Sequence, residues 1–190
     1  MSSSGRATNA TSTSGSCRLA ELPPPILSGT YTTGPVDARV WQRTSGRVRD
    51  PPQFGTPAAE DAVERRAAYA FVRDGRGRFL AVQGAGGLFL PGGGCESGES
   101  PEAALARELR EETGQDLVRL VYRSTAIQHF AADGVSYRMM AAFYAVVLGD
   151  QLSEPEEELL WVDPATGDDS WYHACHAWAV RREAAAPLPN

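Results

Sequence analysis

Three glutamates, Glu108, Glu111 and Glu112, lie close together in a stretch whose composition favours a helix. A helix turns by about 100° per residue, so the three side chains share one face within a single turn. Carboxylates this close repel one another unless a cation lies between them. Hard divalent cations prefer oxygen ligands and in turn bind phosphates. The spacing therefore predicts a Mg²⁺ or Mn²⁺ site that acts on a phosphate compound.

A glycine-rich turn and a capped helix are expected to position these carboxylates. Pro91 and the three glycines at 92–94 disfavour a regular helix or a central strand. Ser100 is a good N-cap, Pro101 suits the first helical position, and Gly114 supplies the left-handed residue that ends a helix. Alternating Glu and Arg on a helix more often mark a solvated face with weak ion pairs, which is the alternative interpretation of the helix alone.

The whole stretch resembles the signature of the Nudix (MutT-like) hydrolases, G-x5-E-x7-R-E-U-x-E-E-x-G-U, in which U is a bulky apolar residue. Eight positions match at the fixed spacing: Gly93, Glu99, Arg107, Glu108, Leu109, Glu111, Glu112 and Gly114. Gln115 departs from the pattern because an apolar residue is expected there, and Leu117 is a candidate to take over its packing role. The resemblance implies an α/β fold, the Nudix-type α/β/α sandwich with a mixed sheet.

The resemblance also implies an activity, the hydrolysis of a nucleoside diphosphate linked to another moiety, X. We expect Glu108 and Glu112 to bind the metal directly and Glu111 to share it or to bind through water. By resemblance, the Gly92 carbonyl completes a metal shell, and Glu99 is either an outer ligand or the partner of Arg107. The expected metal-ligating set is Gly92, Glu99, Glu108, Glu111 and Glu112.

The attacking water needs a general base to accept its proton. Members of the family use either a glutamate of the signature or an acidic residue of a later loop. Glu111 and the acidic run at residues 154–158 are therefore both candidates, and a solvated turn is the alternative for each residue of the run. Glu158 is preferred within it because it directly precedes an apolar strand and Trp161. With Arg107 as a clamp on the carboxylates, the expected catalytic set is Glu111, Glu158 and Arg107.

The composition limits the partners of the chain. Its 190 residues carry a formal net charge of −6, which leaves no broad basic surface for nucleic acid. No stretch is long and apolar enough to span a membrane, and the start lacks the apolar run of a signal peptide. Cys17, Cys95 and Cys175 form no disulfide pattern, which suits a reducing cytoplasm. We expect a cytoplasmic protein that takes a nucleotide or nucleotide-linked small molecule, with a homodimer left open.

The chain divides into three parts by composition. Residues 1–58, rich in Ser, Thr, Gly and Pro, are expected to be a disordered or irregular extension, and a transit peptide is a weaker alternative for its start. Residues 59–184 are expected to form the Nudix domain, and 185–190 a tail. Within the domain, the patterns predict strands at 67–73 and 78–83 (a hairpin), 88–90, 117–130, 136–148 and 159–162, and a last helix at 168–183.

Other residues able to do chemistry have less support. His173, His176 and Cys175 would suit zinc, but a fourth ligand at a sensible spacing is missing, so a packing or capping role is preferred. His129 lies in a strand pattern from which it could reach the active site. Six aromatic residues could stack a base: Tyr69, Phe71, Phe89, Phe130, Tyr137 and Trp161. Most of them are expected to belong to the core instead, because they alternate along apolar strands.

Two functions of different classes remain open. The leading one is hydrolysis, and the alternative is a non-catalytic nucleotide-sensing or regulatory Nudix-like module. Such modules often lose a glutamate of the signature, whereas this chain keeps them all. The residue patterns that resemblance associates with ADP-ribose, NADH or coenzyme A substrates are absent. An ordinary or oxidised (deoxy)nucleoside triphosphate is therefore the preferred substrate.

Overall fold

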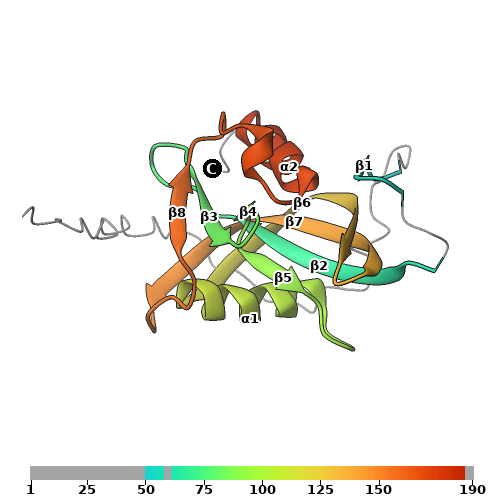
Figure 1. Cartoon of the computed structure of the whole chain (residues 1–190). Helices are drawn as coiled ribbons and strands as arrows, with labels where there is room; N and C mark the ends of the chain where they lie inside the picture. Colours follow the sequence, from blue (N-terminus) through green and yellow to red (C-terminus); the bar gives the residue numbers. More distant parts are fainter. Residues whose placement is uncertain (1–49, 58–60, 187–190) are drawn as a thin grey trace, which may run out of the picture.

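The computed structural model describes residues 50–57 and 61–186 (Figure 1). Most of the expected N-terminal extension, Cys17 and the last four residues of the expected tail lie outside the described residues. Within the described ranges, no helix has both the length and the apolar character needed to cross a membrane.

Five strands form the main sheet, in the order β1-β6-β7-β2-β5. They are β1 (Gln53–Phe54), β2 (Val63–Phe71), β5 (Gly92–Gly94), β6 (Gln115–Ala132) and β7 (Val135–Gln151). The pairs β1–β6 and β2–β7 are parallel and the other two are antiparallel, so the sheet is mixed. The long β6–β7 hairpin turns at Asp133 and Gly134, which have φ of 50° and 77°. The predicted second hairpin is confirmed, and its two turn residues adopt the positive φ that a tight hairpin needs.

Three shorter strands form a second sheet in the order β4-β3-β8, with β3 (Phe79–Gly84), β4 (Gly87–Phe89) and β8 (Leu159–Val162). The prediction that residues 67–73 and 78–83 form one continuous hairpin is wrong, because the two strands belong to different sheets. Among the described residues, the backbones of the two segments pair only next to the turn, through a bridge between Arg73 and Phe79 and a 2.9 Å bond from the Leu80 N–H to the Val72 carbonyl. β2 already pairs with β5 on one side and β7 on the other, so it has no free edge for β3.

Two helices, α1 (Pro101–Thr113) and α2 (Ala174–Ala184), cover opposite faces of the main sheet (Figure 1). The alternation of side chains along β2 explains how both faces are filled. Ala67, Tyr69 and Phe71 join the core under α2, while Ala68, Ala70 and Val72 join the core that contains Leu105 and Leu109 of α1. This arrangement confirms the expected α/β/α sandwich.

The last helix begins later than the sequence pattern indicates. Residues Asp168–Ser170 form a short 3₁₀ turn, and α2 starts only at Ala174. The cause is β4, because Trp171 is extended and bridges to Leu88, and the Tyr172 N–H donates to the Leu88 carbonyl at 3.0 Å. The segment between the two helical pieces therefore lies against the small sheet.

Candidate functional site

A strand made only of glycine places backbone beside the acidic face of α1. The sequence suggests a turn here, and the structure shows the short edge strand β5, antiparallel to β2. A Cβ on Gly92, whose φ is 124°, would collide with the Ala68 carbonyl. A Cβ on Gly93 would lie 2.5 Å from Oε1 of Glu108. The absence of side chains thus lets the strand approach both β2 and the carboxylates.

The helix itself is held as its sequence predicts. Ser100 Oγ accepts a hydrogen bond from the Ala103 N–H at 3.2 Å, Pro101 is the first residue, and Gly114 ends the helix with φ of 70°. Leu105 and Leu109 are fully buried against the sheet. The glutamates therefore face away from the core, toward β5 and solvent.

Arg107 joins the carboxylates of the signature. Its guanidinium donates to both oxygens of Glu99 at 3.2 and 3.1 Å and to Glu108 at 2.9 Å. Further contacts run to Glu111 at 3.4 Å and to the Gly94 carbonyl at 3.1 Å. These hydrogen bonds hold the pKa of the Glu99 carboxyl below its usual value. In this arrangement Glu99 is the partner of Arg107, and Arg107 ties the helix to β5.

Glu112 has a different environment. Its carboxylate accepts a 2.7 Å hydrogen bond from the Gly92 N–H. Burial, followed by the nearby charges of Glu108, Glu157 and Glu111, raises the pKa of Glu112 to about 8 against the effect of that bond. A carboxyl that is costly to ionise next to three other acids is one that a cation would stabilise.

The donor set fits a hard divalent cation by its chemistry. Carboxylate oxygens are the ligands that Mg²⁺ prefers, and Gly93 leaves room beside Glu108. As the side chains lie, however, no three acidic, histidine or cysteine groups among the described residues are arranged around one metal position. Arg107 donates to one oxygen of Glu108 and the Gly92 N–H to one oxygen of Glu112, which leaves each carboxylate further acceptor positions for a cation.

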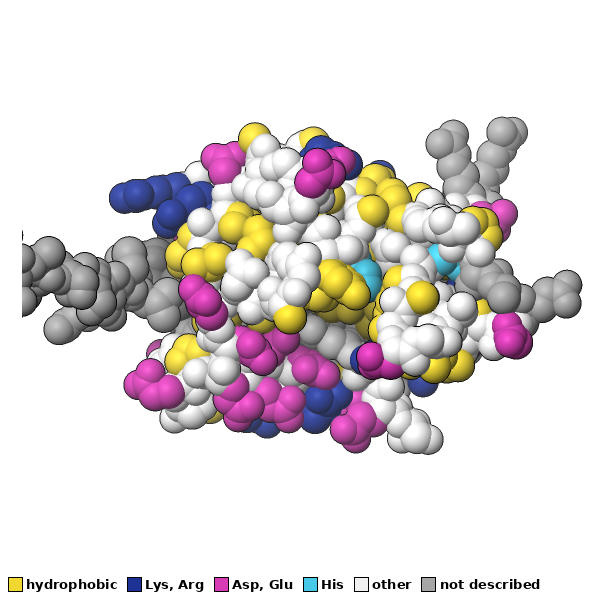
Figure 2. All heavy atoms as spheres, viewed as in Figure 1, with side chains coloured by type: hydrophobic (Ala, Val, Ile, Leu, Met, Phe, Trp, Pro, Cys, Tyr) yellow, Lys and Arg dark blue, Asp and Glu magenta, His cyan; other side chains and the backbone are white. Residues whose placement is uncertain are grey.

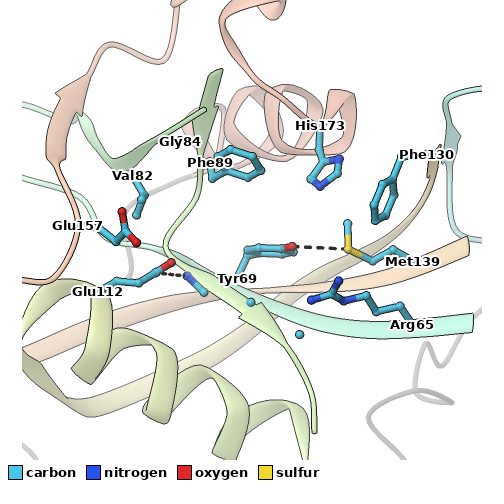
Figure 3. A pocket seen from close by; sticks show the side chains of 13 residues that line it. Arg65, Tyr69, Val82, Gly84, Phe89, Glu112, Phe130, Met139, Glu157 and His173 are labelled. Atoms are coloured by element: carbon cyan, nitrogen blue, oxygen red, sulfur yellow. Dashed lines mark hydrogen bonds between the residues drawn. The ribbon is translucent and has the colours of Figure 1, made fainter. Parts of the chain in front are cut away.

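A pocket of about 330 Å³ opens between β5, the small sheet and the start of α2. Figure 3 shows Glu112 and Glu157 at one end, Tyr69 on the floor, and His173, Phe130 and Met139 at the other end. In Figure 2, acidic side chains gather over α1 on the same face of the molecule. The pocket therefore joins an acidic end to an end walled by aromatic rings, so its two ends offer a ligand different chemistry.

The remaining candidates from the sequence, the acids at 154–158 and His129, differ in whether they reach the pocket. Glu157 lines the pocket, whereas the neighbouring Glu158 uses its backbone carbonyl to accept from the Gln83 N–H at 2.9 Å, which ties the run to β3. His129 is buried beside β1, where its ring bonds to Gln53 Oε1 at 3.0 Å, and it does not line the pocket. Glu157 is therefore the acid of the 154–158 run that the fold brings to Glu112.

The two histidines near α2 are packed groups. His176 is fully buried, and its Nδ1 accepts from the Leu90 N–H at 3.1 Å. Burial lowers the pKa of His173 to about 4 and that of His176 well below its usual value, so both rings are neutral near pH 7. Among the described residues they form no metal group with Cys175. The preferred packing role is confirmed for His176.

Several residues of the pocket were not identified from the sequence. The sequence named Tyr69, Phe89 and Phe130 as rings able to stack a base but favoured the core for most such rings, and it did not predict that Arg65 and His173 line the same pocket. Arg65 and Tyr69 are four residues apart on one face of β2, and this spacing was the available signal. It becomes informative only once β2 is known to lie between β5 and β7.

Comparison with known proteins agrees with this geometry. A family model described as the NUDIX domain matches residues 63–184. The solved structure of a MutT NUDIX hydrolase from Burkholderia pseudomallei is similar at a TM-score of 0.51, with 26% identity over 63% of this chain and 97% of that one. The mutator MutT protein from Bacillus halodurans has a TM-score of 0.53, with 21% identity over 64% of this chain and 83% of that one. A Caenorhabditis elegans Ap4A hydrolase has a TM-score of 0.51, with 20% identity over 65% and 96% of the two chains.

Proposed function

The chain belongs to the NUDIX family, and on that premise we propose that its acidic helix binds Mg²⁺ or Mn²⁺ and directs water onto a phosphorus of a nucleoside diphosphate linked to X. It is a Nudix pyrophosphohydrolase, and the family is generally dependent on divalent metal ions. The observation that carries the proposal is the meeting of Glu108 and Glu112 with the glycine strand at the acidic end of the pocket.

The chain's own groups have distinct roles in this proposal. Glu108 and Glu112 supply oxygens to the metal, with Glu111 shared or bound through water and the Gly92 carbonyl completing the shell. Glu99 holds Arg107, which positions the carboxylates. When bound, a divalent cation would neutralise phosphate oxygens and make the attacking water more acidic. The pocket then orients the rest of the substrate, which raises the rate by fixing the line of attack.

The proton of the water requires an acceptor that reaches the same end of the pocket. Glu111 and Glu158 remain the predictions from sequence. The geometry adds Glu157, since it lines the pocket and its charge acts on Glu112. Replacement of each of the three by glutamine would separate them. Loss of the true base lowers kcat and removes the acidic limb of its pH profile, whereas loss of a neighbouring charge only shifts that limb.

We keep an ordinary or oxidised (deoxy)nucleoside triphosphate as the proposed substrate. The choice rests on the residue patterns, because those associated with ADP-ribose, NADH or coenzyme A substrates are absent. A domain at residues 59–184, a cytoplasmic location and no binding of nucleic acid also remain predictions from the sequence, and a homodimer is left open.

The experiment incubates the full chain with ordinary and oxidised nucleoside triphosphates and with nucleoside diphosphates linked to other groups. Each reaction is run with Mg²⁺, with Mn²⁺ and with a chelator, in H₂¹⁸O to identify the phosphorus attacked. Glu112→Gln should lower kcat by about 10³-fold, the scale of losing one strong stabiliser of transition-state charge. Asp150→Asn likewise replaces a carboxylate by an amide, on an exposed residue outside the pocket, and should leave kcat unaltered.

Hydrolysis is contradicted if wild type and Glu112→Gln release nothing, or release equal amounts, across this panel. Tight nucleotide binding without metal-dependent turnover would instead support the sensing or regulatory module. The intact set of signature glutamates argues against that outcome.

A further inference from the structure

Arg65 extends from β2 into the pocket. Figure 3 shows its guanidinium on the side of Tyr69 away from Glu112 and Glu157. The register of β2 explains the direction, because Arg65 lies on the same face as Ala67 and Tyr69, two and four residues later. The pocket thus has carboxylates at one end and a cation toward the other.

This cation has no partner in the described part of the chain. Its neighbours on β2 are engaged, since Glu64 pairs with Arg138 at 2.8 Å and Arg66 donates to the Glu99 carbonyl at 3.5 Å. No hydrogen bond or ion pair of the described residues holds the Arg65 guanidinium. A guanidinium carries five donors in a rigid fork and no acceptor, so it fits an anionic oxygen pair.

Gly94 determines where the guanidinium lies. A Cβ at position 94 would be 2.6 Å from Nη2 of Arg65 and 2.9 Å from Nε, although the backbone there does not require glycine. The last residue of the glycine strand therefore makes room for Arg65, as Gly93 makes room for Glu108. Gly92, which donates to Glu112, and Gly94, where a Cβ would meet Arg65, are two residues apart, or roughly 7 Å along an extended strand.

We propose that Arg65 binds an anionic group of X, a phosphate or a carboxylate, and so makes the enzyme prefer substrates whose X is charged. The inference rests on the proposed function, which puts the diphosphate and its metal at the acidic end. A nucleoside triphosphate has more negative charge than its metal-bound diphosphate portion accounts for. Among the described residues that line the pocket, Arg65 is the one cationic side chain, so it is the group there that can bind this excess charge.

The test measures binding to the full chain without turnover. The probes are methylene-bridged, non-hydrolysable analogues of ATP and GTP, in which X is anionic, and of ADP-glucose and GDP-glucose, in which X is neutral. Arg65→Gln should raise Kd for the two triphosphate analogues about 10- to 100-fold, the range for a charge-assisted bidentate contact. Kd for the two sugar analogues should change by less than about 3-fold, by the same argument. Calorimetry at low salt is suitable because Arg65 is exposed and salt would screen its charge.

Two further variants test the charge and the position of the guanidinium separately. Arg138→Gln removes the same charge from β7, where Arg138 lies opposite Glu64, the residue before Arg65, and forms an ion pair with it. This variant should leave all four Kd values unchanged. Gly94→Ala keeps the charge but displaces the guanidinium, and should weaken the triphosphate analogues selectively in the same direction as Arg65→Gln.

Each result has one meaning. An Arg65→Gln loss that is equal for charged and neutral X, absent, or dependent on adenine against guanine overturns the inference and leaves the proposed function intact. Binding of the analogues with the predicted selectivity, but no hydrolysis of any natural nucleotide, overturns hydrolysis and supports Arg65 as the anion contact. Failure of the wild-type protein to bind any analogue overturns the inference, while the hydrolysis panel decides the proposed function separately.

Discussion

The two helices that cover the sheet differ in what holds them. α1 has a capping side chain at its start and a left-handed glycine at its end, and its buried face is a simple pair of leucines. α2 has no side-chain cap at its start and no glycine at its end. Contacts from distant parts of the chain hold it instead. Gln128 accepts from the Cys175 N–H at 3.1 Å, and Arg123 pairs with Glu183 at 2.8 Å.

The chemistry divides in the same way. α1 presents charged groups that repel each other and are restrained by Arg107 and by glycine backbone. The start of α2 presents neutral histidines and aromatic rings packed on the other end of the pocket. Changes near α1 should therefore affect turnover more than stability, and changes near α2 should affect stability more than turnover.

Gly93→Ala should give the largest effect and test the α1 half of this contrast. The added Cβ would displace the Glu108 carboxylate, and a misplacement of about 1 Å in an active site costs about 100-fold in rate. We expect kcat/KM to fall by at least that factor while the thermal midpoint moves little, since Gly93 does not have a positive φ. Gly75→Ala, at a position where a Cβ meets nothing, is the matched control. Equal activity of the two variants would show that Glu108 need not lie where it does.

Acid should lower the free energy of unfolding through His173, the residue that precedes α2. His173 packs against the rings of Phe89, Phe130 and Tyr172, with Arg65 and the ring of His176 as its other ionisable neighbours. Its folded pKa of about 4 is below the unfolded value near 6.5, so the unfolded chain binds more protons between these values. Stability is therefore complete above about pH 6.5 and falls as the pH approaches 4.

Urea unfolding at pH 7 and at pH 4.5 measures this effect. We expect wild type to lose about 2 kcal/mol more than His173→Asn between the two pH values, because the variant lacks the titrating ring. Carboxylates that protonate over the same range act in both proteins and cancel in the difference. Parallel curves for the two proteins would exclude His173 as a source of acid sensitivity.

The difference between α1 and the rest of the fold also explains which structural features could be predicted from the sequence. α1, its caps and its signature residues were predictable because each signal is local, within a few residues of the element. The edge strand β5, the separation of β2 from β3 and the late start of α2 were not, because each depends on which strands become neighbours. Arg65, Glu157 and Tyr69 meet in the pocket only through that pairing. Their types were visible in the sequence, but their shared location was not.

Arg123→Met should reduce stability without changing kcat. Its guanidinium joins β6 to the almost fully buried Glu183 of α2, and its loss leaves a carboxylate with little water around it. We expect a loss of roughly 1–2 kcal/mol, less than for a fully buried pair because Arg123 is partly exposed. Thermal unfolding and steady-state kinetics measure the two quantities. The double variant Arg123→Met/Glu183→Gln should recover part of the lost stability, because it no longer buries an unpaired carboxylate. A further loss of stability would contradict the role of this ion pair in holding α2 to β6.

The smallest effect is expected at Gln115, the one position that departs from the Nudix signature. The structure shows why a polar residue is tolerated there, since the side chain is buried and its Nε2 donates to the Gly149 carbonyl at 3.0 Å. Gln115→Leu restores an apolar residue but removes that bond, so a gain from burial opposes a loss of about 1 kcal/mol. We expect the free energy of unfolding to change by less than about 1 kcal/mol in either direction, with kcat/KM unchanged. A clear loss of activity would mean that the end of α1 sets the position of Glu112, and the separation of packing from chemistry on that helix would then be wrong.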